Sequence, residues 1–238
     1  MSIVRFLLTI ALFSSLCLSC WAHPAFQTNS SENDDSGLMM ALLQANPGLL
    51  ENPGPFLIFR TATNYPANMQ GGGAGVDEAD AICQAEAVAA AYSGVFKALL
   101  GTQTTDANPR FACINADCTP SDPSDHTNWV LGANRTYLRA DDMALIGTTT
   151  SHRIFSFPLT NPFTSLPPSR WHWGGIHGSW QTLGPAPGVG GVQSDANGWT
   201  AMSNGWIGYS HATTTQALYT GTSAGWNNSN MHLICVQQ

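Results

Sequence analysis

The stretch Val76-Asp77-Glu78-Ala79-Asp80-Ala81-Ile82-Cys83-Gln84-Ala85-Glu86-Ala87 predicts the main helix of the chain and so decides the fold. Its alanines favour helical backbone, and the acidic residues of its first turn suit the positive end of the helix dipole. We expect this helix to run from Asp77 to about Tyr92. The glycine run before it, residues 71–75, contains GxG but lacks the Lys-Ser/Thr of a phosphate loop, so it predicts an approach to the helix rather than a nucleotide site.

Short strands are expected on both sides of this helix. The apolar run Phe56–Phe59 predicts a strand, and Val95–Leu100 predicts a second short helix. Further strands are expected at 136–138 and 143–146, which form a hairpin around Ala140-Asp141-Asp142, and at 154–157 and 233–236. A helix early and strands late imply the α+β class rather than alternating β-α-β units.

The N-terminus predicts export. Arg5 is the only charge before the apolar run 6–18, which is too short to span a bilayer and is typical of a signal peptide. Cleavage after Ala22 would release His23 as the new N-terminus. Alternatively, Leu18-Ser19-Cys20 resembles a lipobox, with Cys20 as the lipid-modified first residue. Both routes remain open, so we expect either a secreted protein or an outer-membrane surface lipoprotein.

Three segments follow from these patterns: a signal peptide at 1–22, a tether at 23–54 and a single domain at 55–238. The Ser/Asn/Asp-rich part of the tether, 27–37, is expected to be disordered. A short helix is predicted at Leu38–Ala45. Pro53-Gly54-Pro55 marks the start of the folded domain.

Four cysteines remain after the signal: Cys83, Cys113, Cys118 and Cys235. An even number in an exported chain predicts disulfides, with three connectivities open. Metal binding is the alternative, since Cys113 and Cys118 are close enough in sequence to share an ion. No second Cys/His pair at zinc-site spacing accompanies them, which favours disulfides.

The charge balance disfavours two classes of partner. The chain has eight basic against fifteen acidic residues and no basic stripe. Nucleic-acid binding is therefore not expected, and neither is attraction to anionic lipid. Any membrane contact would come from a lipid anchor.

The sequence predicts neither an enzyme nor a cofactor. It has no G-x-S-x-G nucleophile elbow, and Asp141 and Asp142 point in different directions if they lie in a turn. Histidines leave a metal-binding protein or metal-dependent enzyme as an alternative, using His23 or the pair His172 and His177. Trp226-Asn227-Asn228 lacks the carboxylate that a calcium-dependent lectin would use there.

Tryptophans crowd the last third of the chain. Most should be core, since a domain of strands and loops needs large apolar residues there. One or two are expected to lie exposed and to anchor a partner. The candidate ligand-binding residues are Trp171, Trp173, Trp180 and Trp206.

Taken in order, the motifs between Phe56 and Gln238 resemble the leptospiral endostatin-like exported proteins, an uncharacterised family with a C-type-lectin-like fold. The resemblance rests on the stretch 76–87 and on the motifs Phe96-Lys97-Ala98-Leu99-Leu100, Asn128-Trp129-Val130-Leu131, Arg139-Ala140-Asp141, Ile146-Gly147-Thr148-Thr149, Phe157-Pro158-Leu159-Thr160-Asn161, Gly198-Trp199-Thr200 and Leu233-Ile234-Cys235-Val236-Gln237-Gln238.

The resemblance implies a C-type-lectin-like α+β domain with one main N-terminal helix and short, loop-rich antiparallel strands. It implies a long disulfide between Cys83 and Cys235, with Cys113–Cys118 as a local clip. Relatives carry two further cysteines, and Ala196 stands at the place of the first, which predicts a looser loop at 184–197. Members of the family are regarded as surface adhesins for matrix proteins or complement regulators.

These observations together predict an exported, non-enzymatic binding module that recognises a host extracellular protein or glycan. Its binding face is expected on the loops 101–128 and 167–204, because loops on a rigid scaffold carry function. A structural envelope lipoprotein is the alternative from another class. The sequence specifies no oligomeric state.

Overall fold

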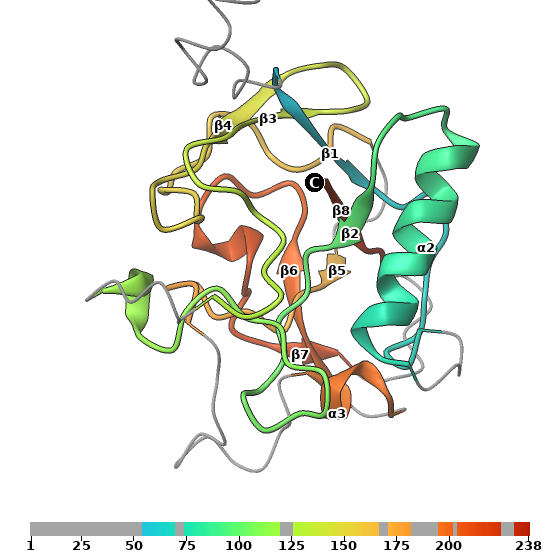
Figure 1. The fold of residues 1–238 in the computed structure, drawn as a ribbon, viewed down its shortest axis with the longest axis vertical. Coiled ribbons are helices and arrows are strands. Elements are labelled where there is room, and N and C mark those ends of the chain that lie inside the picture. Colours follow the sequence, from blue (N-terminus) through green and yellow to red (C-terminus); the bar gives the residue numbers. More distant parts are fainter. Residues whose placement is uncertain are drawn as a thin grey trace, which may run out of the picture. The chain divides into compact units, whose positions relative to one another are not determined.

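The computed structural model describes residues 54–69, 74–119, 126–166, 171–181, 195–201, 204–224 and 231–238 (Figure 1). Pro53–Gln238 forms one compact unit. The predicted signal peptide, the tether and the helix at Leu38–Ala45 lie outside the described residues, and so do Cys20 and His23.

The described strands form two small sheets. The larger has the order β2-β8-β1-β3-β4, and the smaller has the order β5-β6-β7. The strand bounds are β1 Phe56–Arg60, β2 Phe96–Ala98, β3 Thr136–Arg139, β4 Leu145–Thr148, β5 Trp171–Trp173, β6 Gly205–Tyr209, β7 Ser223–Ala224 and β8 Ile234–Gln237. With one main helix, this is an α+β chain, as the order of elements predicts.

One pair of strands corrects the expectation of purely antiparallel strands. Strand β1 lies parallel to β3, with Phe56 opposite Tyr137, so the larger sheet is mixed. A parallel pair needs a long crossover connection. The chain between the two strands supplies it, because it contains the main helix and β2.

The main helix, α2, spans Val76–Ala89 and lies beside β2 (Figure 1). Its buried residues, Val76, Ala79, Cys83 and Ala87, recur at helical spacing and therefore share one face. The helix begins one residue before the predicted start and ends three before the predicted end. Shorter turns of helix occur at α3 Ala196–Trp199, η2 Ala116–Cys118 and η4 Thr215–Ala217.

Strands β1 and β8 of the larger sheet carry core residues on both faces. Successive residues of a strand point to opposite faces, and here Ile58 and Phe59 belong to two different core clusters. In β8, Ile234 and Val236 belong to the first cluster and Cys235 to the second, all three with no exposed surface. This explains why 233–236 is an uninterrupted apolar run.

Two predicted elements differ in the structure. Val95–Leu100 is not helical, because Phe96–Ala98 forms β2 and pairs with β8. Ile154–Phe157 forms no strand beyond an isolated bridge between Thr149 and Phe155. In both places tertiary pairing, rather than local propensity, determines the backbone.

Two disulfides and one buried ion pair link the helix and loops to the sheet. Cys83 on α2 is bonded to Cys235 on β8, and Cys113 is bonded to Cys118. These are the pairings that the resemblance implied. The fully buried Arg110 guanidinium donates to both carboxylate oxygens of Asp80 at 2.7 Å and to the Ala98 carbonyl at 2.9 Å. Helix α2, strand β2 and the loop after β2 are therefore joined at one point.

We predict that the Cys83→Ala/Cys235→Ala double variant loses about 5 kcal/mol of unfolding free energy, since the bond closes a loop with a sequence separation of 152. The matched control is the Cys113→Ala/Cys118→Ala variant, which removes a disulfide with a sequence separation of only 5. It should lose about 2 kcal/mol of unfolding free energy. Denaturant unfolding of the three proteins measures both values. Equal losses in the two variants would contradict the loop-closure explanation.

Candidate functional site

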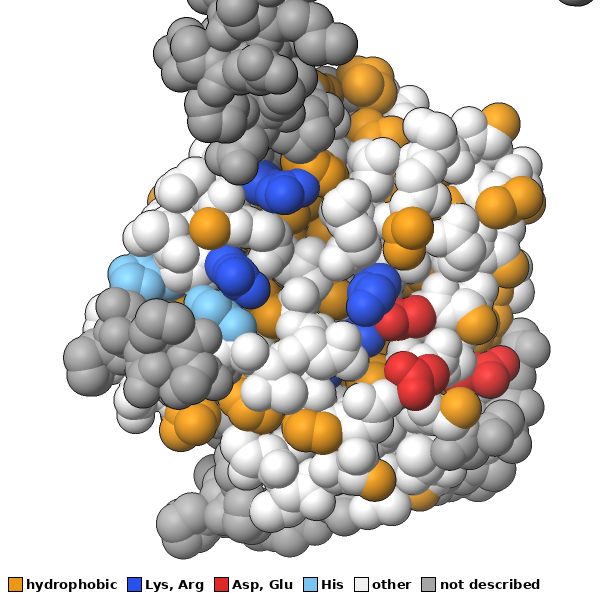
Figure 2. All heavy atoms as spheres, viewed as in Figure 1, with side chains coloured by type: hydrophobic (Ala, Val, Ile, Leu, Met, Phe, Trp, Pro, Cys, Tyr) orange, Lys and Arg blue, Asp and Glu red, His pale blue; other side chains and the backbone are white. Residues whose placement is uncertain are grey.

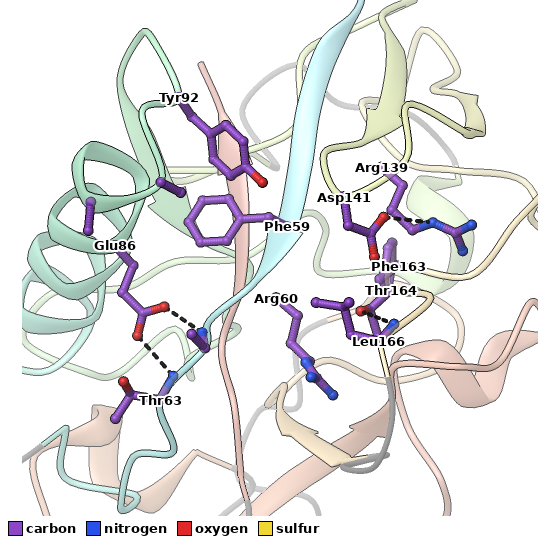
Figure 3. Close-up of a pocket in the computed structure, with 13 residues that line it drawn as sticks. Phe59, Arg60, Thr63, Glu86, Tyr92, Arg139, Asp141, Phe163, Thr164 and Leu166 are labelled. Carbon is purple, nitrogen blue, oxygen red and sulfur yellow. Dashed lines mark hydrogen bonds and ion pairs between the residues drawn. The ribbon is translucent and has the colours of Figure 1, made fainter.

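A cavity of about 400 Å³ lies beside the end of β1. Its walls come from β1, the C-terminal end of α2, the turn between β3 and β4 and the segment 163–166 (Figure 3). The rings of Phe59, Tyr92 and Phe163 and the Leu166 side chain make most of the wall apolar. The volume lies within the range of small-molecule pockets.

The helical side of the cavity ends at Glu86, whose carboxylate is held by three donors. It accepts from the backbone N–H of Ala62 and, at 3.2 Å, from that of Thr63. The Tyr65 hydroxyl donates to it at 2.7 Å. Burial, together with the bond to this carboxylate, raises the pKa of Tyr65 to about 12. Glu86 therefore fixes the segment after β1 against α2.

The opposite side carries an ion-pair network at the β3–β4 turn. Asp141 lies 3.1 Å from the Arg139 Nε and accepts from the Ser165 N–H at 3.0 Å and from its hydroxyl at 2.7 Å. Arg139 also pairs with Asp142 and holds the pKa of that carboxyl well below its usual range. These contacts fix the turn to the segment 163–166.

Arg60 lies between the two sides, with Glu86 on one flank and Asp141 on the other (Figure 3). Partial burial lowers the pKa of its guanidinium, and the negative charge of Asp141 acts in the opposite direction. An arginine remains charged after such a change. The cavity therefore combines apolar walls with one centrally placed cation.

A pair of buried histidines lies behind this cavity. His172 on β5 forms a parallel bridge with His232, and Phe163, which lines the cavity, contacts the His172 ring edge-on at 6.1 Å. The Nδ1 atoms of both histidines are buried and have no hydrogen-bond partner among the described residues. Burial lowers the pKa of His172 to about 3 and also lowers that of His232.

The two histidines proposed as a metal pair lie in different surroundings. His172 is buried against Phe163, whereas His177 is partly exposed and bonds to the Ser179 hydroxyl at 2.7 Å. In the part of the chain that the structure describes, no three His, Cys, Asp or Glu side chains gather to hold a metal ion. His23 lies outside that part.

Two of the candidate tryptophans lie in the core. Trp173 and Trp180 have 0% and 1% exposed surface, so neither presents its ring at the surface. Their indole N–H groups donate to the carbonyls of Tyr65 and Phe155 at 2.8 and 3.0 Å. Burial of these rings is favourable because the indole N–H keeps a hydrogen-bond partner while the apolar ring packs against the surrounding loops.

The other two candidates lie nearer the surface. Trp171 is partly exposed and contacts Tyr209 edge-on at 5.0 Å. Trp206 is 9% exposed and stacks on Tyr219 at 4.1 Å. The predicted binding loops 101–128 and 167–204 are described only in part.

Sequence patterns missed the cavity itself. Arg60, Glu86 and Arg139 lie far apart in the chain, and of the three only Glu86 falls within an element that the sequence predicts, the main helix. One signal was present, since a charged residue follows directly on the apolar run 56–59. Nothing in the sequence shows that the three segments converge.

Residues 66–216 match the family model described as a protein of unknown function, DUF1554. The chain belongs to this family. No curated protein matches the chain. Among the described residues of this DUF1554 chain, no helix has the length and apolar character that a membrane span requires.

We predict that His172 makes the fold sensitive to acid. Its pKa is lowered in the folded state from an ordinary value of 6.5 to about 3, so the unfolded chain binds the proton first as the pH falls. Stability is present above pH 6.5 and is lost progressively toward pH 3, by up to about 4 kcal/mol. Unfolding free energies measured across this range should fall less steeply for His172→Gln.

The matched control is His152→Gln, at a partly exposed position. This variant should keep the acid dependence of the parent chain. An unchanged slope in His172→Gln would show that other groups carry the acid sensitivity.

Proposed function

We propose that this chain is an exported, non-enzymatic binding module of the adhesin type. Its ligand would be a host extracellular-matrix protein, a complement regulator or a glycan. The observation that carries the proposal is the cavity beside β1, which is formed before any ligand arrives. Sites that need no rearrangement avoid the cost of ordering side chains on binding.

The contacts around the cavity support a binding role. The carboxylates of Glu86 and Asp141 accept hydrogen bonds from backbone N–H groups and hydroxyls, and Asp141 also pairs with Arg139. These bonds hold the walls of the cavity in place. An apolar side chain of a partner would fill the space between Phe59 and Phe163, with a carboxylate or carbonyl beside Arg60. Buried anchors of this kind dominate the energy of protein interfaces.

The disulfides support an extracytoplasmic location, because such bonds persist in oxidising compartments. Together with the apolar run 6–18 they favour a secreted protein or a surface lipoprotein of the outer membrane. We further propose that the α+β domain is C-type-lectin-like and that the chain is related to the endostatin-like exported proteins. The ordered motifs from residue 76 to the C-terminus support this relation.

The proposal is tested by screening the purified mature chain against matrix proteins, complement regulators and neutral and acidic glycans. We expect Ala89→Trp to weaken binding of a protein ligand by about tenfold or more, since Ala89 is exposed and lines the cavity. Val88→Trp is the matched control, because Val88 is 67% exposed and does not line the cavity.

Two results would count against the proposal. The absence of detectable binding to every ligand class would contradict the proposed binding function. Equal effects of Ala89→Trp and Val88→Trp on a measured affinity would move the site away from the cavity. Surface plasmon resonance at two salt concentrations provides both affinities.

We also predict that the intact mass of the protein isolated from its native envelope lacks the segment 1–19 or 1–22. A chain beginning at His23 would carry no lipid, and one beginning at Cys20 would carry acyl chains. In either form, reduction should add the hydrogens of two disulfides. A mass that includes Met1 would overturn export through a cleaved signal.

A further inference from the structure

A second hollow, which we call the aromatic groove, has a volume of about 480 Å³ and uses none of the cavity's residues. It lies where the Cys113–Cys118 loop, the turn at 177–181 and the segment 215–221 meet. Its lining includes Asp117, His177, Ser179, Thr215, Tyr219 and Thr220.

Three contacts hold the walls of the groove together. The Asp117 N–H donates to the Ser179 carbonyl at 2.7 Å, and Cys113 forms a parallel bridge with Gln181. A side chain at Gly178 would lie 3.2 Å from the Thr215 Cβ, so the turn and η4 are in close contact. The Cys113–Cys118 disulfide thus has a consequence beyond its own loop, because it fixes Asp117 against the turn.

An aromatic stack forms one wall. Tyr219 lies on Trp206 with ring centroids 4.1 Å apart and planes inclined by 21°. The His177 ring lies 5.9 Å from Tyr219 and 6.3 Å from Trp206. Trp206 is nearly covered while Tyr219 and His177 are partly exposed, so the buried indole supports a tyrosine ring that reaches the groove.

The chemistry of the lining selects among ligands. The described residues of the groove contribute hydroxyls, one amide, one imidazole, one carboxylate and no Lys or Arg. An anion would meet the Asp117 carboxylate with no Lys or Arg to offset it, and a wholly apolar ligand would leave the hydroxyls without partners. A ligand ring with one apolar face and many hydroxyls fits both the aromatic wall and the polar lining. Its hydroxyls can donate to the Asp117 carboxylate, since a carboxylate accepts up to four hydrogen bonds.

We propose that the aromatic groove binds a neutral saccharide, with the apolar face of a sugar ring on Tyr219 and hydroxyls bonded to Asp117 and Thr215. The inference rests on the proposed binding function and names a ligand class and a site for it. The site requires no metal, because the recognising groups are a ring, hydroxyls and a carboxylate that bond the sugar directly.

The test titrates the mature chain with lactose, maltotetraose and chitotetraose in the presence of EDTA, with sialyllactose and a heparin tetrasaccharide as charged comparators. Saturation-transfer NMR detects binding, and loss of any tryptophan fluorescence change in Trp206→Phe assigns that signal to the groove. We expect at least one neutral saccharide to bind, with the charged comparators weaker, and affinity to be unchanged by EDTA.

Variants locate the site. Tyr219→Ala should weaken saccharide binding by about tenfold, while Tyr219→Phe should keep it within about threefold because the ring remains. Asp117→Asn, at an exposed position where folding is not at risk, should weaken it by about fivefold. Tyr209→Ala is the matched control, since this tyrosine contacts Trp171 and does not line the groove.

The outcomes separate this inference from the proposed function. Protein ligands that bind while no neutral saccharide does would overturn the groove assignment and leave the binding module standing. Saccharide binding that survives both Tyr219→Ala and Asp117→Asn would also overturn it. If neither the protein ligands nor the saccharides bind, both proposals are overturned.

Discussion

The disulfide between Cys83 and Cys235 is the constraint on which most of this domain depends, because it ties the last described strand, β8, to the main helix. Strand β8 lies between β1 and β2 and pairs with both. Strand β2 therefore pairs with no other described strand until β8 is in place, and β1 until then pairs only with β3. Such non-local pairing is slow to form and costly in loop entropy, and a covalent bond between α2 and β8 offsets part of that cost.

Buried tryptophans meet a second constraint, which is that much of the chain is loop. Trp173, Trp180 and Trp199 lie in the core, and each donates its indole N–H to a backbone carbonyl, those of Tyr65, Phe155 and Gly101. One side chain thus supplies apolar area and satisfies a polar backbone group that no strand satisfies. These three indole rings are therefore held inside the core and offer no surface to a ligand.

Local sequence patterns were sufficient for the elements that local forces determine. The alanine-rich helix, the strand at 56–59, the hairpin around Ala140–Asp142 and the last strand were all predictable, since each combines periodicity with a turn or dipole signal. Val95–Leu100 was not, because its backbone is set by pairing with β8. The parallel pairing of β1 with β3 is likewise a property of the whole chain.

The candidate site was less predictable than the fold for the same reason. Arg60, Glu86 and Asp141 belong to three separate segments, and their roles exist only once α2, β1 and the β3–β4 turn are in place. The pair Asp106 and Asp195 is a comparable case. Both carboxylates accept from the Gln103 N–H at 2.8 Å, and burial beside Asp195 raises the pKa of Asp106 to about 7. Separate positions in a sequence carry no sign that these two carboxylates will meet at one backbone N–H.

The scarcity of cations limits how this chain can recognise a partner. Only eight Lys and Arg residues are present, and Arg110 and Arg139 are paired with carboxylates while Arg135 lies 4.3 Å from the centre of the Phe56 ring. Long-range attraction of an acidic partner is therefore weak, and the proposed recognition would depend on apolar contact and hydrogen bonds. Those forces act only at contact distance and reward walls that are already in position. The ion pairs, the disulfides and the buried indoles hold such walls in place, so a rigid scaffold with few cations fits the proposed binding function and an affinity that changes little with salt.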